Sequence, residues 1–559
     1  MANPAEPGYP PGPHVPWAPR GDLDPMKYEA WKASIAQDYY NHYFYQGVIP
    51  LAVNPPDDRD DGGIYSYSVR RNANVDFAKF LADFLRWKGD LFDAFTDFFF
   101  LLPTPLGAIQ ELYKDDAQFA LFFLSGPDPT TLELVTDDNQ LPPPLSFKQP
   151  GGRKVQTRTR VPLDFDKALA EHRIFHVDLS KYSHVVSPPR FASWPHAVFI
   201  SVEGTDSFGR KENRLLPIAI ADKASGTCAF PNSSATEWEF AKRAMLTAAA
   251  NYHELGTHLS RCHMTMERYA LATYRNLPAW HPVGRLLRPH FKFMVATNND
   301  AIKNLINPGG PVDSNFAAVI DTLVKVTVDA FSTWDLGTHG GLEADLARRG
   351  LAGDDCKLPF WPYKEYGLNV YGAIRNFVRS YLSLWYPPDG AIYRDDIALQ
   401  TWRRALREEY RAPSLMGDDA SLEDLVTACT NIIWTSGPQH SAVNYTQYDF
   451  LGEAKILPFC IQLAGQKQKF EPTHQQIGDQ GAVISRLSLY RWDQLGNYST
   501  EDFLTEYGDL GDPNKPWRLA VAGFQKELKG LPIPAPETRK GLWDYTFLSP
   551  PNITNGISI

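Results

Sequence analysis

The spacing of apolar residues along this chain of 559 residues predicts a mainly helical body. Apolar positions recur every three to four residues, the period of an amphipathic helix, in several segments of the second half. These segments lie near residues 316–331, 366–386, 395–410 and 421–435. Another long periodic segment follows Thr236, so helices are expected to dominate from about residue 235 onward.

Other stretches carry alternating or continuous β-branched and apolar residues, which is typical of strands. They are RIFHVDLS (173–180), HAVFISVE (196–203) and RLLPIAIAD (214–222). They do not alternate with helices along the chain, so they predict a small antiparallel sheet rather than an α/β fold. We find no internal repeat. The predicted fold class is mainly α, with one large helical domain and a small antiparallel sheet.

The first part of the chain divides into an arm and a helical segment. Residues 1–22 are rich in proline and predict a disordered arm, and residues 23–559 predict the helical domain. Within it, residues 23–48 and 74–125 have helical spacing, and we assign residues 23–110 to an N-terminal helical segment. The apolar stretch FDAFTDFFFLLPTPLGAI (92–109) is either core or a surface that touches lipid.

Composition and charge exclude several classes of function. The formal net charge is −10 and no run is dense in Lys and Arg, so nucleic acid is not an expected partner. The five cysteines are scattered without CxxC spacing, which favours free thiols over disulfides or a thiolate metal site. Neither a signal peptide nor a transmembrane run is found. We expect a monomer that is cytoplasmic or peripherally bound to a membrane.

A cluster of histidines is the strongest chemical signal. Five of the fourteen histidines lie within NYHELGTHLSRCHMTMERYALATYRNLPAWHPVGRLLRPH, at His253, His258, His263, His281 and His290. The zinc-protease pattern HExxH fails here, because the histidine after His253 and Glu254 comes at i+5. On an ideal helix, a spacing of five turns the second side chain by about 140°. His258 and His263 can therefore bind one ion only where the helix widens into a π-bulge. The alternative is that these histidines are hydrogen-bonded core residues.

Two later segments could complete a metal site. His440 and Asn444 are four residues apart, so they share a helix face, and Gln447 could orient the Asn444 amide. The chain ends in the apolar residue Ile559, which suits burial, and a buried α-carboxylate needs a partner such as a metal. Imidazole, amide and carboxylate ligands without thiolate favour iron or manganese over structural zinc. A polar patch between crossing helices is the alternative for the His440 segment.

With these residues in view, the chain resembles the lipoxygenases. The series His253-x4-His258-x4-His263-x17-His281-x8-His290 matches the family signature, HSAVNYTQY (440–448) is similar to a family motif, and GISI matches the usual C-terminus. RIFHVDLSKY, PIAIAD, STWDLGTH and PYKEYGLNVYGAI recur in family order, so the resemblance covers roughly residues 110–559. The preceding segment does not resemble the N-terminal β-sandwich of plant and animal lipoxygenases. We expect a compact form of the bacterial type.

The resemblance implies a non-haem iron dioxygenase with one iron per chain, manganese being the alternative metal. Its substrates would be O₂ and polyunsaturated fatty acids of the linoleate, linolenate or arachidonate type. Hydrogen is removed from a bis-allylic carbon and O₂ adds to give a conjugated hydroperoxide. A fatty-acid hydroperoxide isomerase on the same fold is the main alternative function, and a metal-free lipid-binding protein is another.

The resemblance also implies roles for particular residues. The metal ligands would be His258, His263, His440, Asn444 and the carboxylate of Ile559. His253, His281 and His290 belong to the signature as structural residues. Gln447 and Glu254 would orient the ligands, although Glu254 stands where the family commonly has Gln.

The substrate pocket is expected to include Ala301, Leu305 and Phe316. Ala301 occupies the position that the family links to S or R products, and alanine there favours S. Leu305 would pack across the reacting carbon, and Phe316 would close the floor of the pocket. Ordinary core packing is the alternative role for these three residues. No arginine matches the plant-type anchor for the substrate carboxylate, so the sequence leaves the direction of the bound chain open.

Overall fold

The computed structural model describes residues 25–34, 41–53 and 112–559. The last range has gaps, of which the longest are 387–395, 413–419, 469–478, 499–515 and 533–544. The expected arm 1–22, the apolar stretch 92–109 and most of the segment 23–110 lie outside the described residues. No helix within the described ranges is long and apolar enough to cross a membrane.

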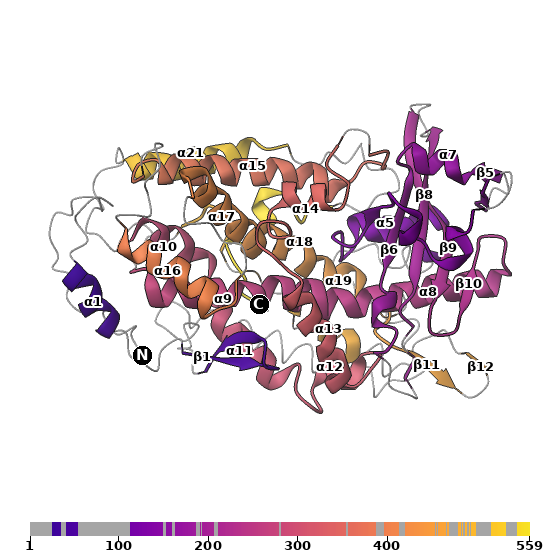
Figure 1. The fold of residues 1–559 in the computed structure, drawn as a ribbon, viewed down its shortest axis with the longest axis horizontal. Coiled ribbons are helices and arrows are strands. Elements are labelled where there is room, and N and C mark those ends of the chain that lie inside the picture. The colour runs from indigo at the N-terminus through magenta and orange to yellow at the C-terminus, as the bar shows by residue number, and fades with distance from the viewer. Residues whose placement is uncertain are drawn as a thin grey trace, which may run out of the picture.

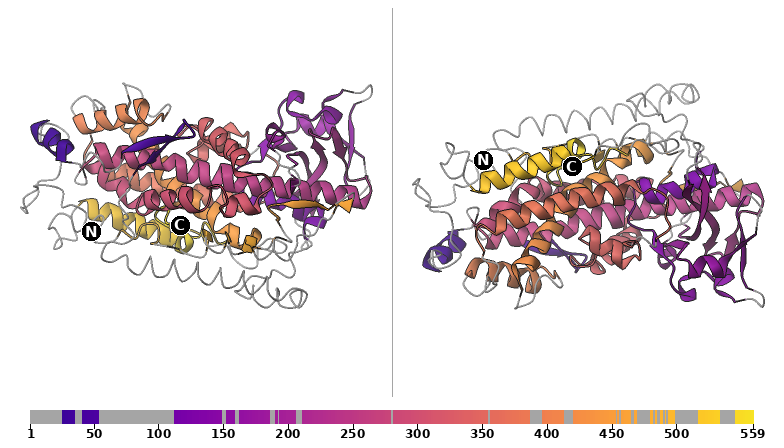
Figure 2. Two further views of the ribbon diagram at one scale, coloured as in Figure 1. Left: turned by 90° about the horizontal axis from the view of Figure 1, so that it is seen from below. Right: turned by 90° about the horizontal axis from the view of Figure 1, so that it is seen from above.

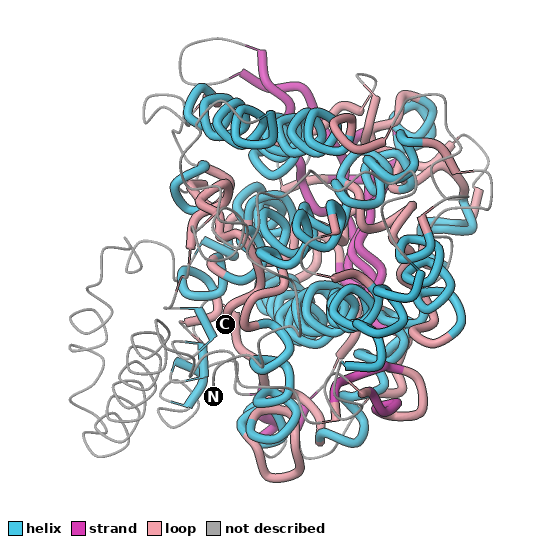
Figure 3. Tube along the Cα trace, turned by 90° about the vertical axis from the view of Figure 1, so that its left-hand side faces the viewer, coloured by secondary structure: helices cyan, strands magenta, loops and turns pink. Residues whose placement is uncertain are grey.

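The helices run along the long axis of the molecule, and the main sheet stands at one end (Figures 1 and 2). Seen along that axis, many of the helices appear end-on and lie side by side (Figure 3). The central element is one continuous helical run, formed by α8 (Ala235–Tyr252), a π-helical segment (His253–Met264) and α9 (Thr265–Asn276). A capping box between Ser234 and Glu237 starts this run by satisfying its first backbone N–H groups.

The helices predicted in the second half are confirmed. They are α13 (Ile320–Ser332), α15 (Pro362–Leu382), α16 (Ile397–Glu408) and α17 (Leu422–Trp434). Of these, α13 packs on the π-helical segment and α16 on α9. The remaining helices are α5 (Asp116–Ser125), α6 (Pro143–Ser146), α7 (Phe165–Ala170), α10 (Pro282–Leu287), α11 (Met294–Asn304), α12 (Pro311–Asn315), α14 (Leu342–Arg348), α18 (His440–Asn444), α19 (Thr446–Phe450) and α21 (Pro516–Gly530).

The predicted sheet is also confirmed. It is antiparallel, with strand order β10–β9–β8–β6–β3, and its members are β3 (Glu133–Leu134), β6 (Ile174–Asp178), β8 (His196–Thr205), β9 (Lys211–Asp222) and β10 (Thr227–Ala229). Phe199 on one face packs against Phe119 and Phe123 of α5 in the main core. Val198 and Ile200, which point to the other face, belong to a smaller separate core. The short strands are β4 (Lys154–Gln156), β5 (Pro162–Asp164), β7 (Arg190–Phe191), β11 (Ile461–Ala464) and β12 (Lys467–Gln468).

The prediction of helix over 23–48 is correct for α1 (Pro25–Ser34) and wrong further on. There, β1 (His42–Tyr45) and β2 (Ile49–Ala52) form a hairpin. Gln46 and Gly47 both have positive φ, of 52° and 73°, which reverses the chain where a helix was expected. Aromatic residues favour strands as well as apolar helix faces, so their spacing alone could not distinguish the two.

The helical body widens at two places. The predicted π-bulge is confirmed and extends over the whole segment His253–Met264. A second π-helical segment, Thr435–Gln439, precedes α18 and contains Pro438. Proline has no N–H and cannot complete an α-helical hydrogen bond, so its presence suits an irregular turn. Such widened turns are frequent at functional sites.

A buried ion pair joins α8 to α5 and can be tested by substitution. Lys242 Nζ lies 2.8 Å from Asp116 Oδ1, and the Lys242 side chain is fully buried. Lys242→Met removes the nearer of the two cations beside the buried Asp116 carboxylate and leaves only Arg158, at 4.0 Å, so we expect a loss of about 3 kcal/mol in the free energy of unfolding by urea. Lys167→Met is the control, since its pair with Glu171 is exposed and is expected to change that free energy by less than about 0.5 kcal/mol. Equal losses in the two variants would contradict this account.

Candidate metal centre

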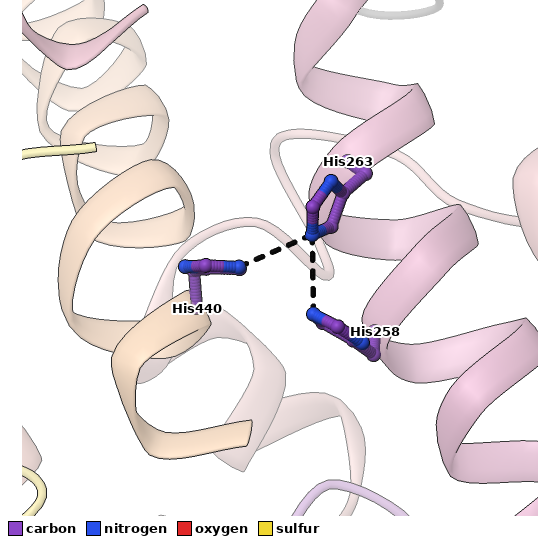
Figure 4. Close-up of side chains that lie close together, drawn as sticks. All are labelled: His258, His263 and His440. Atoms are coloured by element: carbon purple, nitrogen blue, oxygen red, sulfur yellow. Dashed lines mark hydrogen bonds between the residues drawn. The ribbon is translucent and has the colours of Figure 1, made fainter. Parts of the chain in front are cut away.

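Three histidines from two helical segments meet in the interior. His258 and His263 come from the π-helical segment and His440 comes from α18 (Figure 4). His263 Nε2 lies 3.1 Å from His258 Nε2 and 3.1 Å from His440 Nε2. All three side chains are buried, and a ligand atom of each lies within 4.8 Å of the others. The widened turn is what lets residues five apart face the same point.

These three rings are neutral, and one of them presents its lone pair at the meeting point. Burial lowers the pKa of His258 to about 3, that of His263 to about 3 and that of His440 well below its ordinary value. Near pH 7 all three imidazoles are therefore neutral. His263 Nδ1 lies 2.8 Å from the acceptor Asn298 Oδ1, which assigns the ring hydrogen to Nδ1 and the lone pair to Nε2.

The spacing of these nitrogens fits one metal ion. Two lone pairs 3.1 Å apart repel each other unless a hydrogen or a cation lies between them. Metal–nitrogen bonds of about 2.1 Å that meet at right angles place the nitrogens about 3.0 Å apart. The donor set and its spacing therefore suit a metal with several coordination positions.

Asn444 and Gln447 extend the site along the His440 segment. Asn444 ends α18 one turn after His440, and its side chain is buried. Gln447 Nε2 donates to Asn444 Oδ1 at 3.0 Å and lies 3.1 Å from His258 Nδ1. Asn444 Nδ2 has no hydrogen-bond partner among the described residues. Gln447 thus links the Asn444 amide to the π-helical segment that carries His258.

Glu254 and His253 form a second group beside His258. Glu254 Oε2 lies 3.3 Å from His258 Nδ1, and Glu254 Oε1 lies 3.7 Å from His253 Nε2. Burial raises the pKa of Glu254 to about 7. Ligand atoms of His253, Glu254 and His258 also lie within 4.8 Å of one another. His258 belongs both to this group and to the group of His258, His263 and His440. Only the latter group offers three imidazoles.

The cavity beside the histidines contains about 730 Å³ of empty space, part of it open to solvent. Ile559, the last residue of the chain, lines this cavity together with His258 and His263 and is buried. The cavity wall is largely apolar, and it is built from Leu255, Leu259, Ala301, Leu305, Ile306, Val312, Phe316 and Leu487. Its polar lining outside the histidines consists of Glu254, Thr297 and Asp300. A largely apolar lining with a few polar groups is typical of a site for a small organic ligand.

The structure thus brings the three expected pocket residues to one cavity. Ala301, Leu305 and Phe316 all line the cavity. The ring of Phe316 stacks on that of Phe459 with centroids 4.1 Å apart, which fixes its orientation. His440, Asn444 and Gln447 are not among the lining residues, although His440 and Gln447 contact the lining residues His263 and His258.

Two residues that the sequence did not indicate support His263. Asn298 Oδ1 accepts from His263 Nδ1, and Asn298 Nδ2 donates to Glu267 Oε2 at 2.7 Å. Glu267 Oε1 in turn accepts from the backbone N–H of Ala52 in β2 at 2.8 Å. Glu267 lies one turn after His263 on the same helical run, and this spacing could have suggested that it supports His263. Asn298 is 35 residues away along the chain, and no local pattern marks it.

The other signature histidines make structural contacts. His281 Nδ1 accepts from the backbone of Val283 at the start of α10, and His281 Nε2 lies 3.0 Å from Asp396 Oδ2. His290 Nδ1 donates to the backbone carbonyl of Asn555 at 2.6 Å. The His253 ring stacks on that of His258, with centroids 5.9 Å apart.

Comparison with known proteins agrees with this geometry. The Lipoxygenase family model matches residues 218–474, the segment that carries all three histidines. The chain is 29% identical over 379 residues to the seed linoleate 9S-lipoxygenase of Glycine max, covering 61% of this chain and 42% of that protein. It is 28% identical over 486 residues to the polyunsaturated fatty acid lipoxygenase ALOX8 of Mus musculus, covering 80% and 66%. The chain spans less than half the length of the Glycine max and Oryza sativa relatives.

Solved structures share the fold. The crystal structure of coral 8R-lipoxygenase matches with a TM-score of 0.68 and 26% identity, over 82% of this chain and 68% of that one. A lipoxygenase crystallised in complex with arachidonate matches with a TM-score of 0.79 and 23% identity, over 98% and 84%. Residues 218–474 therefore form a Lipoxygenase family domain, and the relatives and the common fold make the chain as a whole similar to the lipoxygenases.

Proposed function

We propose that the protein is a non-haem iron dioxygenase that converts polyunsaturated fatty acids to conjugated hydroperoxides. The observation that carries this proposal is the meeting of three buried, neutral imidazoles, two of which line a largely apolar cavity together with Ile559. The names of the relatives, which include linoleate 9S-lipoxygenases, support linoleate, linolenate or arachidonate as the substrate class. The fold shared with the arachidonate complex agrees with this.

The proposed ligands of the iron come from three parts of the chain. They are His258, His263, His440, Asn444 and the carboxylate of Ile559. This nitrogen and oxygen set contains an anion, which suits an iron that cycles between two oxidation states. When bound, the iron supplies the one-electron oxidation that allows a C–H bond of the substrate to be broken.

The protein's own residues orient the ligands. Asn298 accepts the hydrogen of His263 Nδ1, and this fixes both the tautomer and the plane of that ring. Gln447 donates to Asn444 and contacts His258, so a single amide holds one residue of each helical segment. Since these contacts exist before substrate binds, the site requires little rearrangement.

The cavity positions the substrate and excludes water. A fatty chain is flexible, and its bis-allylic carbon must be held next to the histidines to react. Leu255, Leu259 and Leu305 supply apolar contacts close to that end, and Phe316 limits how far the chain can extend. One C–H bond is replaced by a C–OOH group, so fatty acid and O₂ balance the reaction without a further reductant. Ala301 narrows one side of the wall, where its methyl group favours the S product.

The first test measures metal and product together. The full-length protein supplied with Fe(II) should contain about one iron per chain and should increase the conjugated-diene absorbance of linoleate. His440→Ala removes a proposed ligand and should reduce both iron content and turnover, the latter by at least about 100-fold. His253→Asn alters a residue that is not a proposed ligand and should keep the iron.

Three outcomes would contradict the proposal. Bound iron without diene formation from any of the three fatty acids would exclude the dioxygenase. Faster consumption of a fatty-acid hydroperoxide than of the fatty acid would assign the isomerase instead. Loss of iron from His253→Asn but not from His440→Ala would place the metal at His253, Glu254 and His258.

The product configuration tests the role of Ala301. Ala301→Gly removes a methyl group from the cavity wall and opens space for O₂ at a neighbouring position of the pentadiene. We expect the S fraction to fall and an R hydroperoxide to appear, as measured by chiral chromatography of the products. Ala296→Gly is the matched control, because Ala296 lies buried on the same helix and does not line the cavity. The same product mixture from both variants would show that Ala301 does not control configuration.

A further inference from the structure

The last residues of the chain run through the middle of the molecule, where Figure 1 marks the C-terminus among the helices. Residues 553–559 are all buried. A terminal segment usually frays unless specific contacts hold it. Several such contacts hold the segment here, and we name four of the residues that make them the tail clamp: His290, Gly437, Ser441 and, within the segment itself, Gly556.

His290 holds one side of the segment. Its Nδ1 donates to the backbone carbonyl of Asn555 at 2.6 Å, and its Nε2 accepts from the hydroxyl of Tyr498 at 3.4 Å. The side chain is fully buried, and burial lowers the pKa of His290 to about 4. The ring therefore stays neutral near pH 7, with one nitrogen as donor and the other as acceptor.

Ser441 and Gly437 hold the opposite side. Ser441 Oγ accepts from the backbone N–H of Thr554 at 3.1 Å, and Ser441 directly follows the proposed ligand His440. A Cβ atom at Gly437 would lie only 2.8 Å from the carbonyl oxygen of Thr554. The segment is thus seated against the second π-helical segment and the start of α18.

Gly556 allows backbone to meet backbone. A Cβ atom at this position would lie 2.4 Å from the carbonyl oxygen of His290, closer than any real contact. The backbone N–H of Leu495 also donates to Ile553 O at 2.8 Å, and that of Gly496 to Asn555 Oδ1 at 3.0 Å. Residues 553–556 are therefore fixed in register against three separate parts of the chain.

Only Ile557, Ser558 and Ile559 follow the clamp. Three residues can reach at most about 10 Å, so a shift of one residue at the clamp moves the terminal carboxylate by about 3.5 Å. A shift of that size exceeds the length of a metal–oxygen bond. The position of the last carboxylate therefore depends on the register that the clamp sets.

We propose that the tail clamp is a positioning device that sets the register of the C-terminal segment, so that the Ile559 carboxylate reaches the point where His258, His263 and His440 meet. His290 is its principal positioning residue. The inference rests on the proposed function, in which that carboxylate binds iron. The clamp's hold on the segment can nevertheless be measured without any metal.

The test compares two substitutions of His290 in the full-length protein. His290→Asn keeps an N–H close to the position of Nδ1, whereas His290→Leu has a similar volume and no donor. We expect carboxypeptidase to release Ile559 at least about 10-fold faster from His290→Leu than from the unaltered protein or from His290→Asn. The iron content of His290→Leu should fall towards that of a chain lacking Ile559, and any ferric iron left should give an altered EPR line shape.

A second variant guards against a general folding defect. Gly556→Ala changes the tail and leaves the helical body intact, and its methyl group should displace the segment from His290. We expect the same release of Ile559 and the same loss of iron. Gly523→Ala is the control, because a Cβ atom there meets nothing within 4 Å.

The outcomes separate the clamp from the proposed function. If His290→Leu and Gly556→Ala keep a protected tail, the clamp is wrong. If the tail is released while iron content and EPR line shape stay unchanged, the clamp does not position a ligand and the proposal is overturned. If even the unaltered protein binds no iron, the proposed function fails, and the carboxypeptidase result alone decides whether the clamp holds the segment.

Discussion

The structure depends on one constraint, which is that the Nε2 atoms of three neutral imidazoles converge in a buried place. Burial keeps His258, His263 and His440 uncharged, and His263 Nε2 lies 3.1 Å from the Nε2 atoms of both other rings. Each of these contacts needs a hydrogen or a cation between the two nitrogens, and a cation bound to all three imidazoles would satisfy them together. The widened helix, the ligand-orienting amides and the buried C-terminus can each be understood as a means of building and maintaining this arrangement.

The two π-helical segments each place part of the site, the first by positioning His258 and His263 and the second by leading into His440. In the first, the wider turn brings histidines five residues apart to one face. In the second, it changes the register just before His440 and leaves room at Gly437 for the chain end to pass. The hydrogen bonds of Asn298 and Gln447 then hold the rings at fixed angles. Through Glu267 and Ala52, the same network reaches the β1–β2 hairpin near the other end of the chain.

The sequence predicted those features that depend on local spacing. The histidine intervals predicted a π-bulge if His258 and His263 bind one ion. The four-residue step from His440 to Asn444 indicated one helix face, and the strands of the main sheet followed from β-branched runs. Contacts between distant residues left no such signal. Asn298 meets His263 across 35 residues and His290 meets Asn555 across 265, so neither contact could be derived from spacing. The β1–β2 hairpin was mistaken for helix because aromatic residues suit both structures, and its turn depends on positive φ at Gln46 and Gly47.

The position of the metal tests the account most directly. Crystals of the iron-loaded protein should give a single strong anomalous-difference peak at the iron absorption edge, within bonding distance of the Nε2 atoms of His258, His263 and His440 and of the Ile559 carboxylate. A peak beside His253 and Glu254 would contradict the proposed ligands. So would a peak at the three histidines with the terminal carboxylate well beyond bonding distance.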